Sequence, residues 1–122
     1  MSDKGASYSE YCYLDELPTK LQENLVEIET SSDLRMILYE VKGTEAYWAI
    51  DEWDKYGFQI AVRINAKEAW KRINYQFIRE RLLEKSRGGI EDTKCIWAGC
   101  SNNRVKGVAF CAAHMLQMGA TR

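Results

Sequence analysis

The sequence has one proline and one histidine among its 122 residues, and it has no acidic residue after Asp92. It lacks any apolar run near the roughly 18 residues that a membrane-spanning helix needs. Its first five residues lack the basic-then-apolar pattern of a secretory signal. With 46% apolar and 29% charged residues, the composition is that of a soluble globular protein. We therefore expect a cytoplasmic protein with one domain, or one domain and a small appendage.

The formal net charge of −1 conceals two unlike halves. Residues 1–62 hold five cations and thirteen acids, a net of −8, whereas residues 63–122 hold twelve cations and five acids, a net of +7. Such asymmetry bears on binding partners. Either the two halves neutralise each other, or each half faces a different partner.

The hydrophobic pattern of residues 1–87 predicts an α+β body with the order α-β-β-β-α, preceded by an aromatic and acidic N-terminal arm. Leucines at helical spacing predict a first helix over residues 17–28, with Pro18 in its first turn. Alternating residues joined by short turns predict an antiparallel meander of three strands, over residues 34–42, 45–53 and 58–64.

The last helix of this body is predicted to begin after Asn65. Asn65 with Glu68 three residues later is a variant of the capping box. Ser86, Arg87 and two glycines end the helix, and Gly88-Gly89 is a hinge to a second segment, residues 88–122. The side chains expected to point inward from this helix are Trp70, Ile73, Phe77, Ile78 and Leu82.

The second segment contains three of the four cysteines and the histidine. Cys95, Cys100, Cys111 and His114 have the spacing C-x4-C-x10-C-x2-H. In a cytoplasmic chain such clustering favours zinc over disulfides. Because three thiolates and one imidazole complete a tetrahedron, we expect one structural Zn²⁺ with no open coordination position.

The residues between these ligands suit such a site. Gly99 allows a tight turn before Cys100, residues 104–110 predict a hairpin with Gly107 in its turn, and residues 112–118 predict a helix closed by Gly119. A miniature core is expected from Ile96, Trp97, Val105, Phe110, Leu116 and Met118.

A knuckle, a hairpin and a helix whose first turn supplies the second ligand pair are the parts of a treble clef. Residues Cys95 to Gly119 resemble the treble-clef zinc fingers, especially the short Cys3His fingers of bacterial and phage proteins. The resemblance implies a zinc-binding fold but no single function, because treble clefs occur in nucleases, ribosomal proteins and adaptors. Residues 1–87 resemble no family.

The scarcity of histidine argues against an enzyme. An HNH-type nuclease needs a catalytic histidine, but His114 is already a predicted zinc ligand. Cys12 is the one spare thiol, and no other histidine is present to activate it. Asp33 and Glu40 would lie about 24 Å apart on one extended strand, too far to share a metal ion. We therefore expect a binding protein that is not an enzyme and has no small-molecule substrate.

Two kinds of partner remain open. The first is nucleic acid, or a complex that processes it, bound through basic residues of the second half. Its candidate residues are Lys67, Lys71, Arg72, Arg79, Arg104 and Lys106. We favour this hypothesis because the acid-free stretch coincides with the metal segment.

The alternative is a basic protein, which an inhibitor, antitoxin or immunity-type protein would bind through an acidic and aromatic surface. This hypothesis requires the aromatics of the predicted strands to share the sheet face opposite the helices. Its candidate residues are Tyr11, Tyr39, Tyr47, Asp51 and Trp53.

Overall fold

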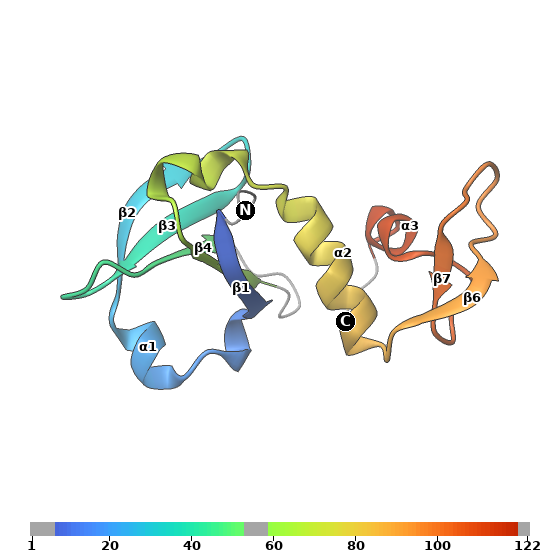
Figure 1. The fold of residues 1–122 in the computed structure, drawn as a ribbon, viewed down its shortest axis with the longest axis horizontal. Coiled ribbons are helices and arrows are strands. Elements are labelled where there is room, and N and C mark those ends of the chain that lie inside the picture. Colours follow the sequence, from blue (N-terminus) through green and yellow to red (C-terminus); the bar gives the residue numbers. More distant parts are fainter. Residues whose placement is uncertain (1–6, 53–58, 120–122) are drawn as a thin grey trace, which may run out of the picture. The chain divides into compact units, whose positions relative to one another are not determined.

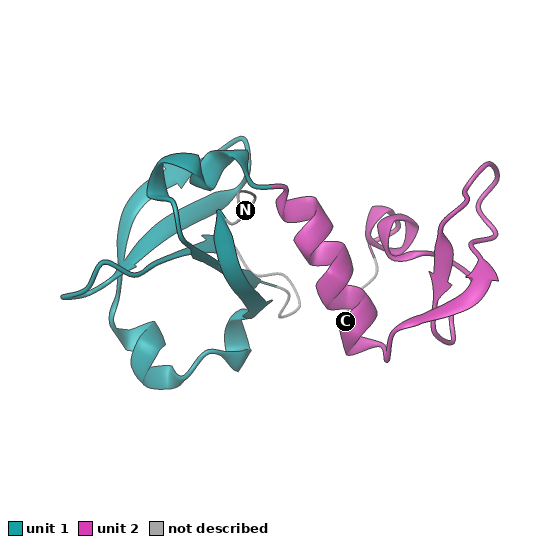
Figure 2. Ribbon diagram, viewed as in Figure 1, with its two compact units in different colours: residues 1–73 teal, residues 74–122 magenta. Residues whose placement is uncertain are grey.

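The computed structural model describes residues 7–52 and 59–119. The chain divides into two compact units, Met1–Ile73 and Asn74–Arg122, which are considered separately below (Figure 2). No helix in the described part of the chain has the length and apolar character needed to cross a membrane.

The first unit contains a five-stranded antiparallel sheet with the strand order β1-β5-β4-β3-β2 (Figure 1). The predicted meander is confirmed as β3, β4 and β5, although each strand is shorter than expected. The elements of this unit are β1 (Tyr8–Tyr13), the 3-10 helix η1 (Leu14–Glu16), α1 (Thr19–Glu23), β2 (Leu25–Ser31), β3 (Met36–Val41), β4 (Tyr47–Asp51), β5 (Ile60–Ile64) and the 3-10 helix η2 (Lys67–Arg72).

The predicted α-β-β-β-α order is wrong at its N-terminal end. The expected helix over residues 17–28 is helical only in α1, and Pro18 is its N-cap residue. The following strand β2 has β-branched residues at Val26, Ile28 and Thr30, which favour extended structure, and it pairs with β3 along the sheet edge. The expected N-terminal arm is also a strand, because β1 pairs with β5.

The second predicted helix is interrupted. The 3-10 helix η2 ends before Ile73, which is extended, and α2 (Tyr75–Ser86) begins after it. Asn74, not Asn65, caps α2, since its side chain accepts a hydrogen bond of 3.1 Å from the backbone N–H of Phe77. Four of the five side chains expected to point inward are buried, but Phe77 is 43% exposed.

Both faces of the sheet carry buried side chains. Leu38 and Val62 are fully buried on one face, and Trp70 of η2 donates a hydrogen bond of 3.1 Å to Glu29, which pairs with Leu38. On the other face, Trp48 forms a cluster of buried residues with Leu17, Ile50 and Ala61. The sheet therefore contributes buried side chains to the core from both of its faces.

The second unit contains α2, β6 (Ile90–Lys94), β7 (Asn103–Val105) and α3 (Ala112–Gln117). Strands β6 and β7 form a two-stranded antiparallel sheet. Its core is a cluster of Leu83, Val105, Ala112 and Met115. Because Leu83 lies on α2, this helix packs with residues of the 88–122 segment, which is called the finger below. The sequence analysis instead placed α2 in the domain of residues 1–87 and began the finger domain at residue 88.

The expected miniature core is correct in part. Val105 is fully buried, and Phe110 and Leu116 are partly buried against the same cluster. Ile96 and Met118 are 60% and 49% exposed, so both lie at the surface instead. The backbone N–H of Ile96 donates to the carbonyl of Ala109 at 3.0 Å.

Candidate metal centre

The four residues with the C-x4-C-x10-C-x2-H spacing converge in the second unit. One ligand atom from each of Cys95, Cys100, Cys111 and His114 lies within 4.8 Å of the other three. The three cysteines form no disulfide with one another. This group of side chains is therefore close enough to hold a metal ion.

The distances fit a small tetrahedral site. Zinc bonds of about 2.3 Å to sulfur and about 2.0–2.1 Å to nitrogen would place sulfur atoms about 3.8 Å apart, and sulfur and nitrogen about 3.6 Å apart. The Sγ atoms of Cys100 and Cys111 are 3.8 Å apart. Nδ1 of His114 lies 3.5 Å from Sγ of Cys95 and 3.3 Å from Sγ of Cys111. These three distances agree with the separations expected between ligands of one zinc ion.

The first ligand pair is positioned by a turn after β6. The backbone N–H of Cys95 donates to the carbonyl of Asn102 at 2.9 Å, which fixes the start of the turn. The N–H of Cys100 donates to the carbonyl of Trp97 at 3.0 Å and closes it. Gly99 has a φ of +81°, a left-handed conformation that favours glycine, so the expected role of this residue is confirmed.

The second ligand pair belongs to α3. Cys111 is the N-cap residue of this helix, and His114 lies three residues later, one helical turn away. The N–H of Met115 donates to the carbonyl of Cys111 at 3.0 Å, and Met115 is buried in the core of this unit. Packing of α3 therefore fixes both ligands.

The surroundings of the sulfur atoms shift the pKa values of Cys95 and Cys100 in opposite directions. Burial raises the pKa of Cys95, but hydrogen bonds from the backbone of Trp97 and Cys111, together with the side chains of His114 and Cys100, outweigh it and lower the pKa to about 6. The backbone of Asn102 lowers the pKa of Cys100, yet burial and the neighbouring sulfur atoms raise it overall. The neighbouring sulfur atoms thus disfavour a second thiolate, and a bound cation would favour the thiolate form of its cysteine ligands.

Two further residues contact the ligands, and the sequence analysis did not assign either of them to the site. The side-chain amide of Asn102 donates to Sγ of Cys111 at 3.8 Å. The ring of Trp97 stacks on that of His114, with centroids 4.3 Å apart and an interplanar angle of 6°. Trp97 and Asn102 each lie between two predicted ligands in the sequence. That position could have identified them as neighbours of the metal site.

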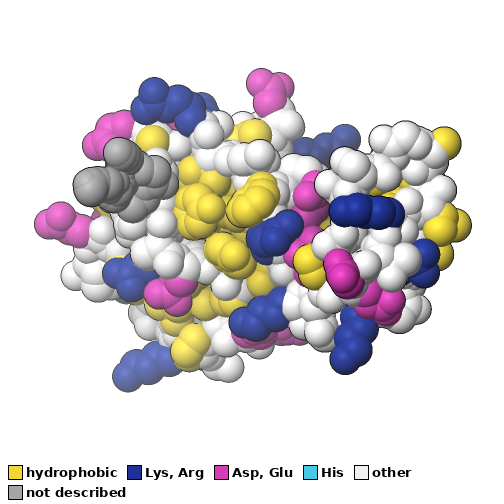
Figure 3. All heavy atoms as spheres, turned by 45° about the vertical axis from the view of Figure 1, so that its right-hand side comes forward, with side chains coloured by type: hydrophobic (Ala, Val, Ile, Leu, Met, Phe, Trp, Pro, Cys, Tyr) yellow, Lys and Arg dark blue, Asp and Glu magenta, His cyan; other side chains and the backbone are white. Residues whose placement is uncertain are grey.

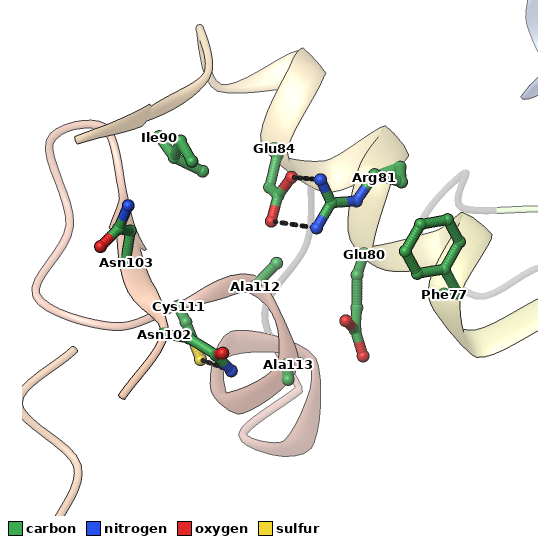
Figure 4. A pocket seen from close by; sticks show the side chains of 10 residues that line it. All are labelled: Phe77, Glu80, Arg81, Glu84, Ile90, Asn102, Asn103, Cys111, Ala112 and Ala113. Carbon is green, nitrogen blue, oxygen red and sulfur yellow. Dashed lines mark hydrogen bonds and ion pairs between the residues drawn. The ribbon is translucent and has the colours of Figure 1, made fainter. Parts of the chain in front are cut away.

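A pocket of about 250 Å³ lies beside Cys111, within the second unit. Figure 4 shows Arg81 and Glu84 of α2 paired on one side of it, and Asn102 reaching Cys111 on the other. The two ion-pair distances are 3.2 and 3.3 Å, so Arg81 holds both carboxylate oxygens of Glu84. The lining residues are Phe77, Glu80, Arg81, Glu84, Ile90, Asn102, Asn103, Cys111, Ala112 and Ala113.

The candidate nucleic-acid residues fall into two groups. Lys67, Lys71 and Arg72 belong to η2 in the first unit, where Lys71 pairs with Glu29 at 2.8 Å and Lys67 lies 5.5 Å from the centroid of the Tyr47 ring. The other three candidates belong to the second unit, where they are Arg79, Arg104 and Lys106. The break after Arg72 therefore divides the basic helix that the sequence predicted.

The candidate protein-binding residues do not share one face. Tyr39 pairs with Trp48, so its side chain lies on the face of the Leu17 cluster. Tyr47 and Asp51 pair with Glu40 and Met36 and thus lie on the opposite face. Tyr11 pairs with Val62 on that opposite face, which is buried. Trp53 lies outside the described residues.

Comparison with known proteins gives no match, since no family model, curated protein or solved structure is significantly similar to this chain.

Proposed function

We propose that this protein is a non-enzymatic zinc-binding protein in which one structural Zn²⁺ holds a treble-clef-like finger that contacts nucleic acid. The observation that carries the proposal is the convergence of one ligand atom from each of three cysteines and one histidine within 4.8 Å of one another. Cysteine and histidine are the ligands that zinc prefers, and four of them leave no position for a catalytic water.

The charge of the second unit supports nucleic acid as the partner. Residues 74–122 hold eight cations and four acids, a net of +4, and all four acids precede Lys94. Figure 3 shows Lys and Arg side chains interspersed with Asp and Glu on the face in view rather than gathered in one patch. The support is therefore the segment after Asp92, which carries cations and no acidic residue of its own, although the carboxylate of Glu91 reaches the backbone N–H of Gly107.

Elemental analysis of the purified protein tests the metal. We expect about one zinc per chain, and we expect Cys111→Ser to lose most of it because one tetrahedral ligand is removed. Cys12→Ser is the matched control, since Cys12 lies on β1 in the other unit and should leave the zinc content unchanged. Zinc well below one per chain in the wild-type protein would refute the site.

Retention on labelled nucleic acid at increasing salt tests the partner. The double variant K94E/K106E reverses two exposed cations of the finger and should elute at lower salt. The control K20E/K42E makes the same charge change at exposed positions of the first unit and should elute close to the wild type. Equal losses in the two variants would contradict a contact through the finger.

A further inference from the structure

Trp97 differs from the other tryptophans that the structure describes. Trp48 and Trp70 are 4% and 2% exposed, whereas Trp97 is 39% exposed. It lies in the turn between Cys95 and Cys100, beside Ile96, which is 60% exposed. The finger therefore presents a large aromatic side chain to solvent at its metal site, although burying that ring in the small core would have stabilised the fold.

The ring of Trp97 is held in place by the metal site. The imidazole of His114 covers one face of the indole in a parallel stack, and Phe110 contacts it at an angle of 68° with centroids 6.3 Å apart. The backbone N–H of Trp97 donates to Sγ of Cys95 at 3.5 Å. An aromatic ring that is already ordered loses little conformational entropy when it binds a ligand.

Basic residues lie close to Trp97 in the sequence. Lys94 precedes Trp97 by three residues, a span of at most about 11 Å of backbone. The side chain of Arg104 donates to the carbonyl of Lys94 at 3.4 Å, so both residues lie at the same end of the β6–β7 pair. No acidic residue occurs between Lys94 and the last residue of the sequence. The chain segment that carries Trp97 thus has basic residues and no acidic ones, a charge that is complementary to a phosphate backbone.

We propose that Trp97 is a base-stacking platform, and that the finger consequently selects single-stranded over double-stranded nucleic acid. This inference rests on the proposed function and names its substrate class. A duplex keeps its base faces stacked inside, so an exposed ring can stack only on a base of an open strand. Cations beside an aromatic ring are the combination that binds single strands with little sequence preference.

The test compares a labelled single strand with its own duplex by fluorescence anisotropy, using the full zinc-loaded protein. We expect tighter binding to the single strand, and a loss of about five-fold to one-hundred-fold in that affinity for Trp97→Ala. Trp97→Phe should retain most of the affinity because it keeps an aromatic face. Duplex binding should change little in either variant, while K94E/K106E should weaken binding to both forms.

A second measurement avoids dependence on how Trp97→Ala folds. In a Trp53→Phe background, intrinsic fluorescence comes from Trp97 and two buried tryptophans. A single-stranded oligonucleotide should quench it, whereas heparin, which has charge but no bases, should not.

The outcomes separate the two proposals. Equal affinity for single strand and duplex, or no quenching by a bound single strand, would overturn the role of Trp97 and leave the proposed function standing. An absence of binding to either form at low salt would refute nucleic acid as the partner. Unchanged single-strand affinity in Trp97→Ala with its zinc retained would likewise overturn the stacking role of Trp97.

Discussion

Glu29 joins two segments of the first unit that are far apart in the sequence. Its carboxylate accepts a hydrogen bond from the indole N–H of Trp70 and pairs with the ammonium group of Lys71 at 2.8 Å. The contact with Lys71, followed by that with Trp70, lowers the pKa of Glu29 below its usual 4.5. This side chain therefore ties η2 to strand β2.

The lowered pKa predicts how stability depends on pH. Between the folded and unfolded pKa values the unfolded chain binds more protons, so the stability that Glu29 contributes is present above about pH 4.5 and is lost on acidification. We expect Glu29→Gln to be less stable than the wild type at pH 7, with the difference shrinking as the pH falls below 4.5. Urea unfolding, followed by the fluorescence of the buried tryptophans, measures it.

The control for this prediction is Glu68→Gln, which removes an exposed carboxylate from η2 itself. Its stability relative to the wild type should stay nearly constant over the same pH range. A difference between wild type and Glu29→Gln that does not shrink on acidification would show that shape, not charge, matters at this position.

Single residues also explain why the metal site could be predicted from the sequence. Its ligands fall within twenty residues, in two pairs that local turns bring together, so their spacing almost specifies the geometry. Trp97 and Asn102 were not predicted as neighbours of the site because their roles depend on which way a ring and an amide point. Spacing carries no information about that.

Among the secondary-structure elements, strands were predicted better than their mutual register. The alternation within β3 and β4 is correct for each strand alone. The turn between them nevertheless pairs Tyr39 with Trp48 and Tyr47 with Glu40, so the two tyrosines point to opposite faces. A shift of one residue in a turn reverses every side chain of a strand, and hydrophobic alternation alone does not fix that shift.

The helix α2 illustrates a similar limit. Its apolar residues predicted a buried face, but periodicity cannot say which core that face joins. In the structure Leu83 of α2 is 1% exposed and packs with Val105, Ala112 and Met115 of the finger. The helix thus supplies one side of the core on which α3, and with it two metal ligands, depends.

This packing predicts that Leu83→Ala weakens the finger. Loss of a buried leucine side chain costs about 2–5 kcal/mol, and because metal binding is coupled to folding, zinc should also be released at a lower chelator concentration. Hydrogen exchange would show faster exchange in residues 90–117. Phe77→Ala, at a 43% exposed position of the same helix, is the control and should have a small effect. Equal effects of the two substitutions would place the important contacts elsewhere.

At the scale of the whole molecule, the charge asymmetry follows the two units. Residues 1–73 hold nine cations and fourteen acids, a net of −5, against +4 for residues 74–122. The boundary differs from the simple division into halves, since η2 adds three cations to the acidic unit. Each unit has its own cluster of buried residues, one on the five-stranded sheet and one around Leu83.

Separate cores predict that removing the metal unfolds one unit and spares the other. Two of the buried residues of the second unit, Cys95 and Cys111, are predicted metal ligands, and zinc binding worth roughly 10–16 kcal/mol in finger peptides would supply much of its stability. The first unit buries Leu38, Trp48 and Val62 without any metal ligand. After chelation of zinc, we expect amide signals of residues 88–119 to lose their dispersion in NMR spectra, while those of the five sheet strands keep their positions. Adding zinc back should restore the lost signals.

Collapse of the sheet signals together with those of the finger would show that the two units fold as one. Unchanged finger signals would show that the core around Leu83 is sufficient without the metal.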